Sequence, residues 1–187
     1  MMILVLGLVL WMTVHLFPSV APAQRQQLID RLGENAYKGV FSLLIILSIV
    51  LMVLGWRTTL PAYVYLPAAP LALPAMLLVV LGLVLVVAAN FPSRIKKLIR
   101  HPQLSGVLLW ALAHLMLNGD SRSVMLFSAL GAWCVISMLT TNKREGAWIK
   151  PEPSGWGTEI LIVVIAVLVS ALLMHFHSYL SGVPLAV

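Results

Sequence analysis

Six long apolar stretches, separated by short polar segments, dominate the pattern of this sequence. They run over residues 3–17, 40–56, 71–89, 104–117, 124–140 and 160–176. Apolar runs of this kind are typical of transmembrane helices, which need about 20 residues to cross the hydrocarbon core of a bilayer. The pattern therefore predicts an all-α integral membrane protein, with one domain over 1–187 built as a bundle of six transmembrane helices.

Composition supports the same class of protein. Of the 187 residues, 61% are hydrophobic and 10% are charged, whereas a soluble domain has about 25% charged residues. A chain with so few polar groups cannot cover its surface against water. The expected solvent for most of this protein is membrane lipid, and its net charge of +6 reflects orientation in the membrane rather than binding to nucleic acid.

Charge also decides whether the shortest stretch, 104–117, crosses the membrane or is a buried or re-entrant helix. With six crossings, ten of the twelve basic residues fall in cytoplasmic loops: Arg25, Arg31, Lys38, Arg94, Lys96, Lys97, Arg100, Lys143, Arg144 and Lys150. Positively charged loops prefer the cytoplasmic side. We therefore predict six crossings with both the N-terminus and the C-terminus outside, in the periplasm. Although 21–23 resembles a signal-peptide cleavage site, no basic residue precedes the first stretch, which predicts a retained helix.

Two histidines stand out as candidate ligands, because ligating groups inside a membrane are costly and usually functional. His15 lies about twelve residues into the first stretch, roughly 18 Å from its outer end, and His114 lies roughly 15 Å from the cytoplasmic end of the fourth. Within a core about 30 Å thick the two are expected at similar depth. The other histidines, His101, His175 and His177, are expected near the ends of helices.

A pair of imidazoles at one depth suits a haem whose iron takes two axial histidines. Side chains one turn before each histidine offer aromatic or small surfaces for a flat apolar ring, and Asn118, one turn after His114, offers a polar contact. The predicted cofactor-binding residues beside the two histidines are Trp11, Trp110, Ala111 and Asn118. Spacing alone leaves a second interpretation open, in which the histidines form hydrogen bonds between helices.

Several short motifs together give the sequence a resemblance to a known family. They are HLFPS at 15–19, LGE at 32–34, YKG at 37–39, GWR at 55–57, PSR at 92–94, RHPQ at 100–103, WALAH at 110–114 and NGD at 118–120. This combination resembles the NnrU family of bacterial membrane proteins over most of residues 1–130. The resemblance implies a place in the bacterial inner membrane, a link to denitrification, and nitrite or nitric oxide reductase components as partners.

The plant and cyanobacterial 15-cis-zeta-carotene isomerase is similar in sequence and is a membrane enzyme with haem b. By motif, its haem-ligating histidines fall on His15 and His114, so the resemblance implies haem b as cofactor. The isomerase has a cysteine three residues before the second histidine, where this chain has Ala111. Because alanine cannot ligate iron, the isomerase's ligand exchange and its substrate do not carry over directly.

Three functional hypotheses follow from the sequence. The first is a haem-b-binding protein that is accessory to respiratory nitrogen-oxide metabolism. The second is a redox-gated, haem-dependent cis/trans isomerase of a polyene such as zeta-carotene. The third is a membrane assembly or scaffold factor without a cofactor, in which the histidines only pair helices.

Overall fold

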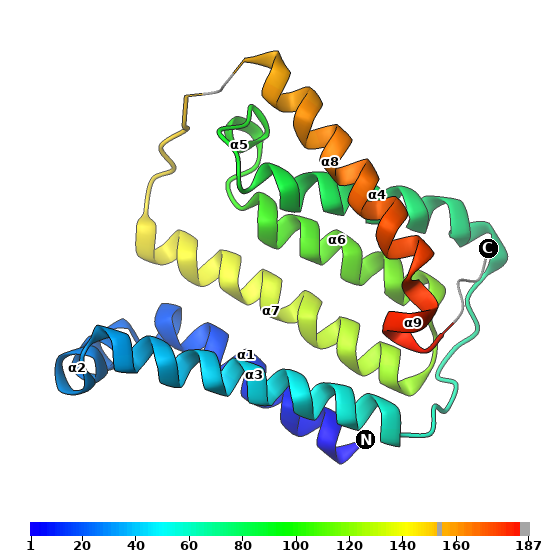
Figure 1. Ribbon diagram of the computed structural model, residues 1–187, viewed down its shortest axis with the longest axis horizontal. Coiled ribbons are helices and arrows are strands. Elements are labelled where there is room, and N and C mark those ends of the chain that lie inside the picture. Colours follow the sequence, from blue (N-terminus) through cyan, green and yellow to red (C-terminus); the bar gives the residue numbers. More distant parts are fainter. Residues whose placement is uncertain (153–154, 184–187) are drawn as a thin grey trace. The chain divides into compact units, whose positions relative to one another are not determined.

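The computed structural model describes residues 1–152 and 155–183, and Figure 1 shows that they are helical apart from connecting loops. The predicted all-α class is confirmed: these residues contain no β-strand, and their one isolated bridge joins Tyr63 to Asp120. The helices are α1 (Met2–Val20), α2 (Pro22–Leu32), α3 (Glu34–Thr58), the 3-10 turn η1 (Ala69–Leu71), α4 (Ala72–Ala88), α5 (Ile95–Leu98), α6 (Pro102–Leu117), α7 (Ser121–Glu145), α8 (Trp156–His175) and α9 (His177–Ser181).

Five of the described helices are long and apolar enough to cross a membrane: α1, α3, α4 with its 3-10 turn, α7 and α8. The remaining apolar helix, α6, has 16 residues. At about 1.5 Å per residue it is roughly 24 Å long, which is less than the thickness of about 30 Å of a bilayer core. Each of the six predicted apolar stretches overlaps one of these helices.

The apolar side chains of these helices are largely uncovered by protein. Leu43 on α3, Leu77 on α4 and Leu168 on α8 are 66%, 62% and 64% exposed. Surfaces of this size are not left to water in soluble monomers. Lipid is therefore the solvent for these faces, and the chain is a multi-pass membrane protein.

The first helices begin and end at positions other than the ends of the apolar stretches. The segment between the first two apolar stretches is itself helical, because α2 starts with Pro22 at its first turn and α3 starts at Glu34, well before the apolar stretch at 40–56. Gly33, which separates them, has a φ of +81°, a conformation that favours glycine. An apolar run thus marks the part of a helix that meets lipid, and the helix continues beyond it.

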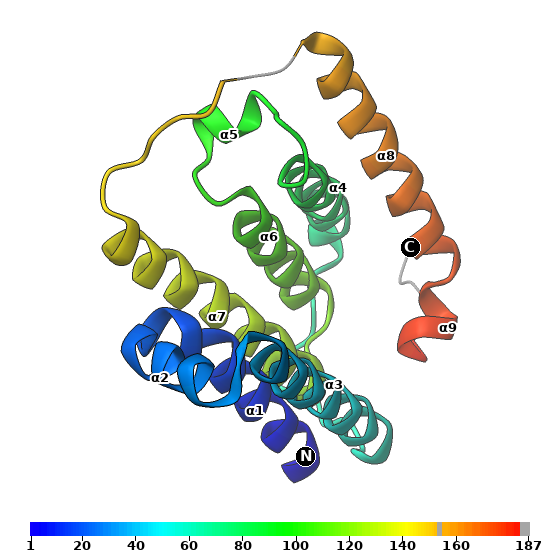
Figure 2. The same cartoon turned by 60° about the vertical axis from the view of Figure 1, so that its left-hand side comes forward.

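The chain forms two compact units, and the first comprises Met1–Val64 with Asp120–Glu145. Its central helix is α1, which packs against α3 and α7, while α2 lies against α3, as Figures 1 and 2 show. Glycine makes the close contact between α1 and α3: a Cβ on Gly7 would lie 2.7 Å from the backbone nitrogen of Met52, and one on Gly55 would overlap the backbone of Leu4. Two helix backbones therefore meet where a side chain is missing.

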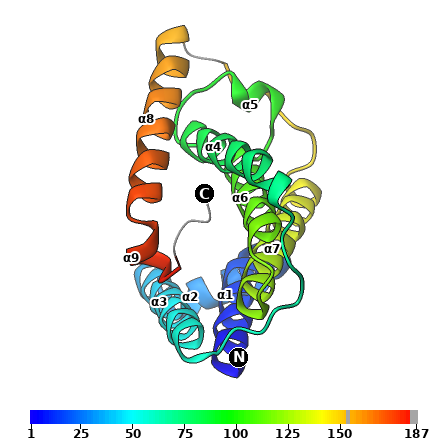
Figure 3. The same cartoon turned by 90° about the vertical axis from the view of Figure 1, so that its right-hand side faces the viewer.

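The second unit comprises Tyr65–Gly119 and the described residues from Gly146 onward. Its central helix is α4, which packs against α6 and α8, as Figure 3 shows. Gly82 on α4 and Gly106 on α6 face each other, since a Cβ on Gly82 would lie 2.7 Å from the carbonyl oxygen of Gly106. The small size of Gly106 thus serves the packing of α4 on α6.

Candidate functional site

His15 lies on α1 in the first unit, and its ring is held by the helix that carries it. Its Nδ1 is 3.0 Å from the carbonyl oxygen of Trp11. Because a carbonyl oxygen only accepts hydrogen bonds, Nδ1 must carry the proton, and in the neutral ring Nε2 then carries the lone pair. A metal-ligating histidine typically shows this arrangement, with its second nitrogen bonded to a carbonyl or carboxylate.

Three aromatic rings surround His15. The Trp11 ring centroid is 4.1 Å away, that of Trp133 on α7 is 5.6 Å away, and that of Phe41 on α3 is 6.1 Å away. Trp11 and Trp133 also contact each other edge to face at 4.6 Å. Rings contributed by three helices thus form an apolar enclosure around one imidazole.

Trp133 adds a polar feature that sequence reasoning missed. Its indole Nε1 is buried and has no hydrogen-bond partner among the described residues. A buried donor without an acceptor is rare in folded proteins and is often a sign of a ligand or water that completes the site. No local signal singles out Trp133, which lies inside an apolar stretch; only the packing of α7 on α1 brings it to His15.

His114 lies on α6 in the second unit and repeats the local arrangement of His15. Its Nδ1 is 2.8 Å from the carbonyl oxygen of Trp110, so this nitrogen also donates, and the Trp110 ring centroid is 4.6 Å from the imidazole. Ala111 is only 1% exposed. The side-chain amide of Asn118 donates to the backbone carbonyl of His114 at 3.0 Å, so Asn118 binds the helix end that carries the histidine.

Both histidines therefore belong to the same local element, a tryptophan followed four residues later by a histidine. One helical turn places the two rings on one face and puts the tryptophan carbonyl within reach of Nδ1. His15 and Trp11 lie in the first unit, whereas His114, Trp110, Ala111 and Asn118 lie in the second. Each unit thus presents one imidazole with the lone pair on Nε2.

Comparison with known proteins gives one family. The family model described as NnrU protein matches residues 3–185. The chain belongs to the NnrU family. The match confirms the resemblance seen in the motifs and extends it over nearly the whole chain. No curated protein and no solved structure matches the sequence.

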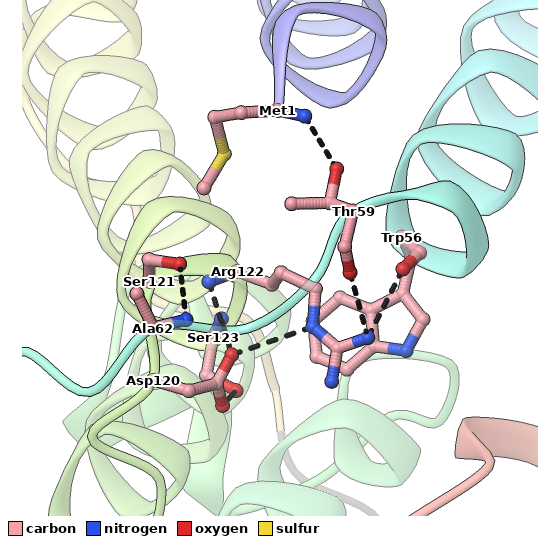
Figure 4. Close-up of polar contacts among 8 residues, drawn as sticks. All are labelled: Met1, Trp56, Thr59, Ala62, Asp120, Ser121, Arg122 and Ser123. Carbon is pink, nitrogen blue, oxygen red and sulfur yellow. Dashed lines mark hydrogen bonds and ion pairs between the residues drawn. The ribbon is translucent and has the colours of Figure 1, made fainter.

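A second polar cluster of this NnrU protein, in the first unit, surrounds Asp120 (Figure 4). The Asp120 carboxylate accepts hydrogen bonds from the backbone N–H groups of Arg122 and Ser123 at 3.0 and 3.2 Å and from the Ser123 hydroxyl at 2.5 Å. The Arg122 guanidinium lies over the Trp56 ring, donates to the carbonyls of Trp56 and Thr59, and pairs with Asp120 at 3.5 Å. Asp120 therefore caps α7 and, through Arg122, joins it to the end of α3.

The same contacts determine the protonation of Asp120. Burial raises the pKa of its carboxyl, but the hydrogen bonds from Ser123 and Arg122 and the positive charge of Arg122 outweigh burial, so the pKa lies below its ordinary value. These contacts hold the start of α7 and the end of α3 together, so Asp120 and Arg122 stabilise the fold.

In the second unit, Glu159 at the start of α8 holds the loop before α5. Its carboxylate accepts hydrogen bonds from the Ser93 hydroxyl at 2.9 Å and from the Arg94 backbone at 2.7 Å. Ser93 is fully buried and also accepts from the backbone N–H of Ile95, while Arg94 lies over the Trp156 ring at 4.5 Å. Glu159 thus joins the first turn of α8 to the loop before α5 by tertiary contacts.

The remaining histidines lie at helix ends, as the sequence predicts. His101 precedes the first turn of α6, His175 contacts the Phe176 ring at 4.8 Å, and His177 Nδ1 donates to the Val183 carbonyl at 3.0 Å. Among residues 1–152 and 155–183, no group of three or more His, Cys, Asp or Glu side chains is placed to hold a metal ion.

Proposed function

We propose that this NnrU protein binds haem b in the bacterial inner membrane, with His15 and His114 as axial ligands, and acts as an accessory to respiratory nitrogen-oxide metabolism. The observation that carries the proposal is the shared state of the two imidazoles. In each, Nδ1 donates to the carbonyl of a tryptophan four residues earlier, which puts the lone pair of the neutral ring on Nε2, the nitrogen through which we propose that each histidine ligates the iron.

The residues around the histidines fit this cofactor. A porphyrin is a flat apolar ring, and His15 is enclosed by Trp11, Trp133 and Phe41, while His114 is beside Trp110 and the buried Ala111. The Trp133 Nε1 group, which has no acceptor in the described part of the chain, is a donor for which a ligand would supply the acceptor. When bound, haem b held by two histidines would supply a one-electron redox centre; this chain's own contribution is the tautomer of each imidazole, held by the carbonyls of Trp11 and Trp110.

The proposed topology has six crossings, with α6 as the short fourth one and both termini in the periplasm. Its support is the distribution of positive charge, because six crossings put ten of the twelve Lys and Arg residues on the cytoplasmic side. Five crossings without α6 would separate the basic cluster at 94–100 from the one at 143–150. An α6 shorter than the bilayer core is accommodated by local thinning of the bilayer.

The test is an ultraviolet-visible spectrum of the full chain, purified in detergent from haem-replete cells. We expect a Soret band that shifts on reduction and a stoichiometry near one haem per chain by pyridine haemochromogen assay. His15→Ala and His114→Ala should each lose most of the bound haem, whereas His175→Ala should keep it. His175→Ala is the matched control, because all three variants remove one imidazole from a membrane helix.

A colourless wild-type protein would overturn the haem proposal and favour a scaffold role without a cofactor. Equal haem loss in His175→Ala would show that the assignment of ligands is wrong. For the link to nitrogen-oxide metabolism, deletion of the gene should lower nitrite or nitric oxide reductase activity under denitrifying growth, and normal activity would remove that part of the proposal.

A further inference from the structure

The first unit also contains a cavity, which lies at the end of its helices where α1, α2, α3 and α7 meet. Its volume is about 520 Å³, within the range of roughly 300 to 1,000 Å³ of small-molecule sites. The polar residues that line it are Arg25, Tyr37, Lys38, Ser42 and Arg144, and its remaining lining is apolar, from Phe41 and two prolines. Of these lining residues, only Phe41 has a role in the haem proposal.

The cavity is positively charged. Three of its lining residues are cations and none is acidic. Lys38 pairs with Glu34 at 2.7 Å, and Arg144 with Glu145 at 3.2 Å, but both acids lie outside the lining and the pairs are at least 40% exposed. Exposed pairs of this kind are weak and exchange readily with other anions. The cavity is thus complementary to an anion.

The arginines are held in place by polar and aromatic neighbours. The Arg25 guanidinium lies over the Tyr37 ring, 5.6 Å from its centroid. Arg144 donates to the Ser19 hydroxyl at 3.2 Å, which links the end of α7 to the end of α1. Arginine forks placed in this way suit the oxygens of a phosphate group.

Tyr37 provides independent evidence for a ligand. Its hydroxyl oxygen is buried and has no hydrogen-bond partner among the described residues, although Tyr37 lines the cavity. A buried hydroxyl without a partner costs stability, so such groups are rare unless a ligand or water completes them. An anion in the cavity would accept the hydrogen bond that the protein leaves unmade.

We propose that this cavity binds the phosphate of an anionic phospholipid, such as phosphatidylglycerol. Its place at the ends of the membrane-spanning α1, α3 and α7 puts it at headgroup depth, and its apolar lining suits the glycerol and acyl region of a lipid better than a free ion. In the proposed topology this end is cytoplasmic, and the cytoplasmic leaflet is rich in anionic lipid. Lipid binding at this cavity does not require haem, so the lipid proposal is tested independently of the haem proposal.

The test is a thermal-shift titration of the full chain in detergent with three probes: dioctanoyl phosphatidylglycerol, dioctanoyl phosphatidylcholine and inorganic phosphate. We expect saturable stabilisation by phosphatidylglycerol, with little effect of the other two. The double variant Arg25→Gln/Arg144→Gln should weaken the apparent Kd by more than tenfold, since each removes hydrogen bonds to a charged group. The matched control is Arg31→Gln/Lys143→Gln, which removes two exposed charges outside the cavity.

Tyr37→Phe is the most specific variant, because it removes one hydroxyl oxygen that has no hydrogen-bond partner within residues 1–152 and 155–183 and so leaves the unliganded fold intact. We expect it to weaken phosphatidylglycerol binding about tenfold without lowering the melting temperature of the lipid-free protein. Equal weakening in the Arg31/Lys143 control would overturn the proposal, as would unchanged binding by Tyr37→Phe. Stabilisation by inorganic phosphate as strong as that by phosphatidylglycerol would overturn the lipid as ligand.

Discussion

Replacing Asp120 by alanine should destabilise the protein, because it removes the contacts of the Asp120 carboxylate shown in Figure 4. The substitution removes the cap of α7, worth about 1 kcal/mol. It also takes from Arg122, whose side chain is only 15% exposed, its charged partner, at a cost of about 1 to 2 kcal/mol. For a chain of this size the total of about 2 to 3 kcal/mol corresponds to a fall in Tm of about 5 to 10 °C.

The assay is the Tm of the detergent-purified protein, followed by size-exclusion chromatography after heating, for Asp120→Ala, Asp120→Asn and Asp30→Ala. Asparagine caps helices as well as aspartate does, so Asp120→Asn should lose only the charge contribution and melt between the wild type and Asp120→Ala. Asp30→Ala is the control, since Asp30 has an exposed hydrogen bond to Gln26. Equal falls in Tm for Asp120→Asn and Asp120→Ala would refute the assignment of separate contributions to the helix cap and to the negative charge.

The pH dependence of stability gives a second measurement at this residue. Because the folded protein lowers the pKa of Asp120, the carboxylate stabilises the fold at pH values above its unfolded pKa of about 3.9. That contribution is lost as the pH falls through the lower folded value. The Tm difference between wild type and Asp120→Asn should therefore shrink below about pH 4; a difference that stays constant to pH 2.5 would contradict the assignment.

Three further predictions concern other contacts. Gly55→Ala should destabilise the protein by about 1 to 3 kcal/mol, because its Cβ would overlap Leu4. Gly39→Ala, with open space around it, should be neutral or stabilising by about 0.5 kcal/mol, and a fall in its Tm as large as that of Gly55→Ala would contradict this reasoning. Glu159→Gln and Ser93→Ala should each cost about 1 kcal/mol and be non-additive in a double-mutant cycle, and full additivity would show that their hydrogen bond is not made. If haem binds at His15, Trp133→Phe should keep the Soret band but shift the midpoint potential of the haem. An unchanged potential would show that Trp133 does not interact with the cofactor.

The sequence by itself determined the apolar helices and the local hydrogen bond of each candidate ligand. Long apolar stretches predicted helices, because lipid offers no partner for a backbone that is not internally bonded. The Trp-to-His spacing of four residues is also a local property: one helical turn brings the Trp11 carbonyl to His15 and the Trp110 carbonyl to His114. Motifs within the chain were enough to indicate the NnrU family, which the match over residues 3–185 confirmed.

Only the tertiary structure decided which distant residues meet. Trp133 reaches His15, and Arg144 reaches Ser19 beside the cavity, because α7 packs on α1 across more than a hundred residues of chain. Glu159 binds Ser93 from 66 positions away. The helical part of 22–39 was also hidden, since it is polar and carries no apolar run. Hydropathy and spacing indicate only which residues lie within a turn or two of one another on the same helix. Which helices pack together depends on small residues such as Gly7 and Gly55, because they allow two backbones to touch. That role is visible only in the tertiary structure.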